Sequence, residues 1–167
     1  MADVHAIVRT DNMSATRDGS LIVSGRFYDA GDNLAAIENA NIVLIKDYDK
    51  DEREVRIVTV PTADTEIKNV GLVCTPELIY DESKRHGLED FINEAGKEIR
   101  VFRLHANDIF SATKEAFEGT PAKGSYAVVG NTTKMKVSEV ATGSVIGKIV
   151  EVETVGADTY YAVQVTM

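Results

Sequence analysis

A run of alternating aspartates is the first feature of the sequence that could do chemistry. Asp47, Asp49 and Asp51 occupy the first three ligand positions of a calcium-binding EF-hand loop. That loop needs glycine at its sixth position and glutamate at its twelfth, where this chain has Glu52 and Val58. The match fails where it is most specific. We therefore interpret the run as the charged tip of a hairpin, with adventitious Ca²⁺ binding as the alternative, and predict no metal site.

The sequence also lacks the common motifs of catalytic and phosphate-binding sites. His5, His86 and His105 are far apart and have no metal-ligand spacing. There is no G-x-S-x-G nucleophile elbow and no complete phosphate-binding loop. Residues 143–148 only resemble such a loop inside a strand pattern, which is more typical of a bulge or a tight packing point. We predict a protein that is not an enzyme and uses no cofactor.

The single cysteine, Cys74, follows the apolar run 70–73, so we interpret it as a small buried hydrophobic residue rather than a nucleophile. No intrachain disulfide can form, and the N-terminus lacks a basic region followed by an apolar stretch. No apolar run approaches the roughly 20 residues that span a bilayer. These features predict synthesis and folding in a cytoplasm, with no membrane partner.

The composition excludes further classes of function. The formal net charge is −9 and the estimated pI is about 4.8, so phosphate backbones are repelled and a nucleic-acid partner is not expected. Tryptophan is absent and aromatic residues make up 7% of the chain, which disfavours a sugar-stacking platform. The acidic side chains either form a solvated surface or complement a basic partner.

β-Strands are the elements that must position any functional site in this chain, because strand patterns dominate the sequence. The continuous apolar run 41–45 is typical of a strand covered on both faces, and residues 70–74 form another apolar segment. Residues 53–60 return after the charged tip and complete a hairpin. Short alternating segments separated by glycine-containing turns fill the last seventy residues. The sequence predicts a mainly β fold, a small antiparallel β-barrel or sandwich with one or two short helices.

The best helix candidate covers residues 87–95, where Leu88, Phe91 and Ile92 fall on one helical face and Gly96 can end the helix. Residues 1–18 have a weak pattern around the island Ala6-Ile7-Val8. We interpret them as an extended N-terminal arm, with an edge strand and loop as the alternative. Residues 19–167 are expected to form a single β-rich domain, which can divide into a hairpin-rich half (19–75) and a small barrel (76–167).

From about residue 50 to the end, the order and spacing of several motifs are similar to a family of tailed-bacteriophage head decoration proteins. The motifs are turn and strand sequences rather than catalytic signatures. They are 75–82 (TPELIYDE), 93–97 (NEAGK), 103–105 (RLH), 108–111 (DIFS) and 143–153, centred on KIVE.

The resemblance implies a structural virion protein on the capsid exterior, made in the host cytoplasm, whose partner is the major capsid protein. Contact with further copies of itself, as a trimer or as neighbours, is a second expectation. The arm is the first candidate for shell binding by strand addition, through Val4, Ala6, Ile7, Val8 and Arg9. A tail, baseplate or fibre-tip module that recognises a host surface ligand is the alternative function. A small β-barrel enzyme or ligand carrier would need a concave pocket with converging polar groups.

Overall fold

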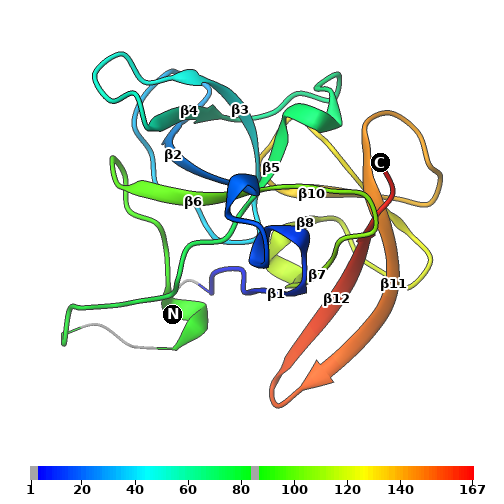
Figure 1. The fold of residues 1–167 in the computed structure, drawn as a ribbon. Coiled ribbons are helices and arrows are strands. Elements are labelled where there is room, and N and C mark those ends of the chain that lie inside the picture. Colours follow the sequence, from blue (N-terminus) through cyan, green and yellow to red (C-terminus); the bar gives the residue numbers. More distant parts are fainter. Residues whose placement is uncertain (1–3, 84–86) are drawn as a thin grey trace.

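The chain folds into a closed β-barrel packed against an open sheet (Figure 1). The computed structural model describes residues 4–83 and 87–167. The barrel has the strand order β2-β4-β3-β5-β6, in which β2 and β4 are parallel and the other pairs are antiparallel. Its strands are β2 (Ile22–Tyr28), β3 (Ile42–Tyr48), β4 (Val55–Thr59), β5 (Val70–Val73) and β6 (Glu98–Arg103).

The second sheet has seven strands in the order β1-β7-β12-β11-β9-β10-β8. All its pairs are antiparallel except β10 with β8. The strands are β1 (Val8–Asn12), β7 (Ile109–Thr113), β8 (Phe117–Glu118), β9 (Tyr126–Val128), β10 (Met135–Ser138), β11 (Val145–Val155) and β12 (Asp158–Val165). The end of the β11–β12 hairpin projects from the body of the molecule (Figure 1). Single 3₁₀ turns cover Ser14–Thr16, Gly19–Leu21, Ile67–Asn69, Leu88–Asp90 and Lys114–Ala116.

The two hydrophobic cores explain the continuous apolar runs. Side chains alternate across a strand, so neighbouring residues point to opposite faces. In β3, Val43 joins the core inside the barrel, and Ile42 joins the core between the barrel and the open sheet. In β5, Val73 and Leu72 divide in the same way. The prediction that the run 41–45 forms a strand covered on both faces is therefore confirmed, as is the mainly β fold.

The predicted helix at residues 87–95 is wrong. Only Leu88–Asp90 is helical, as one 3₁₀ turn, and Asn93 then pairs with Ile37 in a β-bridge. Asn93 also donates its side-chain amide to the backbone oxygen of Ile37 over 3.0 Å. A continued helix would give up these bonds, so tertiary pairing overrides the local apolar spacing. The described residues contain no helix long and apolar enough to cross a bilayer.

Two predictions about organisation also need correction. The closed barrel lies in residues 22–103, whereas the finer division expected it in 76–167. Over residues 4–18 the chain is not an extended arm, because Val8–Asn12 pair with β7 and a 3₁₀ turn follows. The edge-strand alternative describes this segment, and residues 1–3 lie outside the described part of the chain. The core between the two layers contains residues from Ala6 to Val165, so the barrel and the open sheet both contribute to it.

Candidate functional site

The structure describes all five sequence-predicted contact residues, namely Val4, Ala6, Ile7, Val8 and Arg9. Ala6, Ile7 and Val8 are buried, with 2%, 3% and 8% of their surface exposed. Thr113 N donates to Ile7 O over 3.1 Å, and Ile7 N donates to Thr113 Oγ1 over 3.1 Å. Val4 is 58% exposed, and the Arg9 side chain is 40% exposed. The core therefore uses three of the five side chains, and a partner could reach only Val4, Arg9 and the outer edge of β1.

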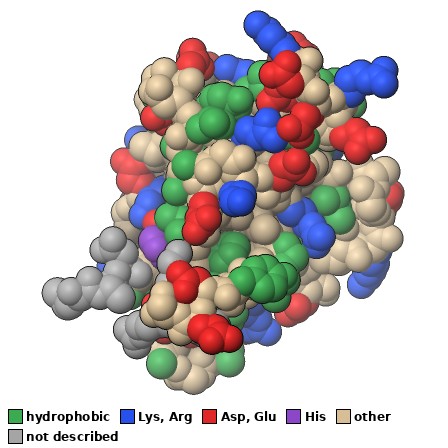
Figure 2. Space-filling model, turned by 90° about the vertical axis from the view of Figure 1, so that its left-hand side faces the viewer, with side chains coloured by type: hydrophobic (Ala, Val, Ile, Leu, Met, Phe, Trp, Pro, Cys, Tyr) green, Lys and Arg blue, Asp and Glu red, His purple; other side chains and the backbone are tan. Residues whose placement is uncertain are grey.

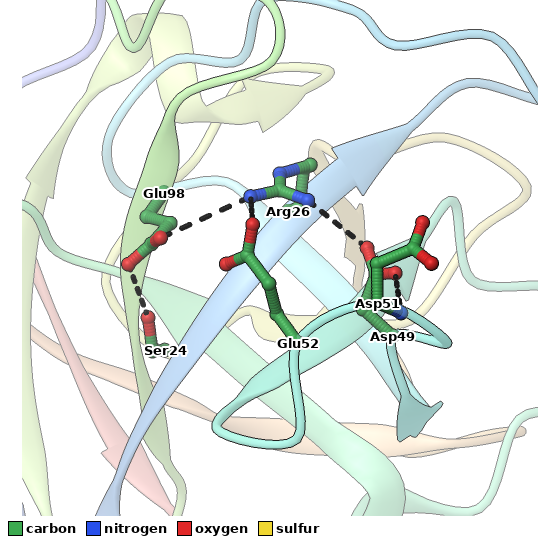
Figure 3. A network of polar contacts seen from close by, with 6 residues as sticks. All are labelled: Ser24, Arg26, Asp49, Asp51, Glu52 and Glu98. Carbon is green, nitrogen blue, oxygen red and sulfur yellow. Dashed lines mark hydrogen bonds and ion pairs between the residues drawn. The ribbon is translucent and has the colours of Figure 1, made fainter.

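The acidic hairpin tip is held by an arginine (Figure 3). Arg26, on β2, pairs with Asp49 and with Glu52 at 3.1 Å each, and with Glu98 at 3.8 Å. The hydrogen bond with Glu52 is the largest cause that raises the pKa of the guanidinium. The network ties β2 to the β3–β4 loop and to β6, so it fastens one end of the barrel.

The aspartates of the partial EF-hand match do not converge on a common point. Asp49 accepts a hydrogen bond from the backbone N of Asp51 over 3.1 Å and turns its other oxygen to Arg26. Within residues 4–83 and 87–167, no group of three or more His, Cys, Asp or Glu side chains could hold a metal ion. The arrangement supports the interpretation as a charged hairpin tip.

Cys74 lies partly buried against the core between the two layers. Burial is the largest cause that raises the pKa of its thiol, to about 11, and a hydrogen bond with Thr10 partly opposes this shift. The thiolate is the nucleophilic form of cysteine, so a thiol that stays protonated at neutral pH is inert. This environment suits a packing residue.

A groove of about 570 Å³ lies beside the barrel, between the chain that follows β5 and the chain that leads into β6. We call it the 75–98 groove. One wall is the extended segment 75–81, and the other is formed by residues 90–94 with Lys97 and Glu98. Its lining residues are Thr75, Pro76, Leu78, Ile79, Tyr80, Asp81, Asp90, Phe91, Ile92, Asn93, Glu94, Lys97 and Glu98.

Two buried asparagines hold the walls of this groove together. Asn39 and Asn93 are 1% and 5% exposed. The Asn39 amide donates to Thr75 O over 2.8 Å and to Glu77 Oε1 over 3.0 Å, and its oxygen accepts from Thr75 N over 3.1 Å. Asn93 Nδ2 donates to Asn39 Oδ1 over 3.1 Å, which links the second wall to the same side chain. The Asn39 and Asn93 amides therefore link the two walls of the groove.

Apolar side chains are exposed along this part of the surface. Tyr80 is 86% exposed, Leu78 is 61% exposed, and Leu88 and Leu34 are each about half exposed. Phe91, which also lines the groove, is 8% exposed. Figure 2 shows the face to which the segment around residue 80 belongs, with hydrophobic side chains exposed among acidic ones. Isolated exposed leucines are ordinary, but apolar side chains gathered at a groove mark an interaction surface.

The surroundings of the groove are acidic. Among the described lining residues, four are carboxylates and one is a lysine. Asp90 accepts a hydrogen bond from Gly87 N over 3.0 Å, and Glu98 accepts from Ser24 Oγ over 3.2 Å. Between residues 75 and 98 the sequence carries seven carboxylates against three basic side chains. The groove therefore combines an apolar lining with a negative field.

Sequence reasoning did not find Leu78, Tyr80, Asn39 or Asn93 as site residues. A weak signal was present, because Leu78 and Tyr80 alternate with Ile79 in a segment that begins at a proline. No comparable signal marked the asparagines, since their function depends on a contact across more than fifty residues.

Comparisons with known proteins give no match to a family model, to a curated protein or to a solved structure.

Proposed function

We propose that this protein is a head decoration protein of a tailed bacteriophage, which binds the outer surface of the capsid and stabilises the head. The observation that carries the proposal is the convergence of two motifs. Residues 75–82 and 93–97 are separate parts of the resemblance, and both contribute residues to the 75–98 groove. If the two motifs are similar to those of the decoration proteins because they bind the same kind of partner, they are expected to lie together at one exposed apolar surface.

The fold suits a mechanical role. A closed barrel has no free sheet edges, and a shared core joins it to the second sheet. The two layers therefore form one rigid body that can present a contact surface. The major capsid protein is the proposed partner. A decorated lattice repeats each contact many times, so modest affinity per copy is sufficient.

Binding to the phage head tests the proposal. The purified chain is mixed with heads of the phage that encodes it, after the resident copies are removed, and the mixture is sedimented. We expect saturable co-sedimentation, and antibody labelling of intact virions on the capsid rather than the tail. Labelling confined to the tail or fibres would contradict the proposal and support a host-recognition module instead.

A further inference from the structure

We infer that the 75–98 groove binds an extended, basic polypeptide segment that carries apolar side chains. This inference deepens the proposed function and rests on it, because it names the chemistry of the partner that the proposed capsid-binding protein would recognise. Three properties of the groove lead to it: its dimensions, its exposed apolar side chains and its charge.

The dimensions favour a few inserted side chains. A groove of about 570 Å³ is comparable to pockets that enclose small ligands, which fall at about 300–1,000 Å³. Its walls are the segment 75–81 and residues 90–98, and it is open to solvent. An extended segment of a partner can therefore lie along the groove and place alternate side chains in it.

Two exposed side chains are the natural anchors. Tyr80 and Leu78 are 86% and 61% exposed beside a lining of Pro76, Ile79 and Phe91. Burial of such side chains contributes most of the binding free energy of many interfaces, and tyrosine is among the residues enriched there. Apolar side chains on the partner are required to bury them.

The charge selects a basic partner. Four carboxylates and one lysine are among the described lining residues, and the whole chain has a formal net charge of −9. Lysine or arginine beside the apolar side chains of the partner would meet an attractive field, whereas nucleic-acid phosphates would be repelled. A second copy of this chain carries the same acidic surplus, so self-association through this groove is disfavoured.

Fluorescence polarisation with the full chain tests the inference. The probe is a labelled peptide of about ten residues in which lysine alternates with valine and leucine, a length that spans about 33 Å when extended. Two control peptides replace every lysine by glutamine or by glutamate. We expect binding of the lysine peptide, about tenfold weaker binding of the glutamine peptide and none of the glutamate peptide, with affinity falling as salt is raised.

Matched variants locate the binding. Leu78→Ser and Glu94→Lys should each weaken the lysine peptide about tenfold. Val140→Ser and Glu139→Lys are the controls, because Val140 is 60% exposed and Glu139 is also exposed, both on the β10–β11 loop away from the groove. All four positions are on the surface, so circular dichroism should show folded variants.

The outcomes separate this inference from the proposed function. Equal binding of the three peptides, or equal loss in the control variants, would overturn the inference. A dimer of the parent chain that becomes monomeric in Leu78→Ser would assign the groove to a second copy and also overturn it. Head binding that survives Leu78→Ser and Glu94→Lys would reject the groove as the contact while the decoration function stands. Peptide binding at the groove without head binding would reject the decoration function alone.

Discussion

Arg26 Nη1 lies 3.1 Å from Asp49 Oδ2, and the pair joins β2 to the loop after β3. Their side chains are 17% and 10% exposed, whereas Glu52, which contacts the same guanidinium, is 46% exposed. The two carboxylates therefore share one cation at different depths. Solvent screens the Glu52 pair far more than the Asp49 pair.

This difference in depth predicts unequal effects of two similar substitutions. Asp49→Asn should lower the free energy of unfolding by about 1–3 kcal/mol, because it removes a largely buried charge-assisted hydrogen bond. Glu52→Gln should change it by less than about 1 kcal/mol, as expected for an exposed pair. Urea denaturation of both variants measures the difference. Equal effects would mean that burial does not govern the strength of these pairs.

Asn39 is expected to set the geometry of the 75–98 groove. Asn39→Leu should cost about 2–3 kcal/mol, because it leaves the N–H and C=O of Thr75 without their partner. Amide hydrogen exchange should accelerate over residues 75–80, since that wall loses its anchor. Asn12→Leu is the control, because Asn12 is exposed at the end of β1. Unchanged exchange in Asn39→Leu would show that other contacts hold the wall.

The first strand is expected to matter for stability more than for binding. Ile7→Ala should lower the free energy of unfolding by about 2–5 kcal/mol, the usual range for a buried isoleucine. Val4→Ala should have an effect below about 0.5 kcal/mol, because Val4 is 58% exposed. Thermal or urea unfolding distinguishes them. A deletion of residues 2–18 would remove core side chains as well, so loss of head binding by that variant must be compared with its stability.

Gly147 should not tolerate a side chain. A Cβ there would overlap the backbone oxygen of Gln164 on the paired strand β12, which cannot move without disturbing the hairpin. Gly147→Ala should therefore lower the free energy of unfolding by about 1–3 kcal/mol. Gly19→Ala is the matched control, because no atom lies within 4 Å of its Cβ position. Equal stability of the two variants would show that the hairpin adjusts at no cost.

Cys74 should react slowly in the folded protein. The pKa of the thiol is raised to about 11 from an ordinary 9.0. At about pH 8 its thiolate fraction is therefore about a hundredfold below that of a free thiol. Iodoacetamide labelling followed by mass spectrometry measures the rate, and the unfolded chain in urea should label at the ordinary rate. Cys74→Ser should show no labelling. Fast labelling of the folded chain would place the thiol in a more open environment.

The same shift has a consequence for stability at high pH. The unfolded state loses the Cys74 proton first, since its pKa lies below that of the folded state. The contribution of the protonated thiol to stability is therefore complete below about pH 9 and is lost as the pH rises toward about 11. Cys74→Ser should remove this part of the pH dependence from denaturation curves.

Local patterns predicted strands well and failed where distant residues intervene. The apolar run at 41–45 and the alternation in the last seventy residues both lie in strands of the structure. The failed helix at residues 87–95 has proper apolar spacing, but Asn93 pairs with Ile37, far away in the chain. The segment 75–81 had only a weak alternation and no helix pattern, and the buried Asn39 amide anchors it at Thr75.

The sequence by itself determined the mainly β class, because side-chain alternation shows how many faces of each strand are buried. It also determined that the run from Asp47 to Asp51 lacks the glycine and glutamate of an EF-hand loop. Only the tertiary structure decided which strands pair. Ile22 lies opposite Phe102, and Ser24 lies beside Val55 in parallel, so residues distant in sequence close the barrel. The periodicity of a segment shows which of its faces are buried but not which other segment it pairs with. Both the closed barrel and the 75–98 groove depend on that pairing.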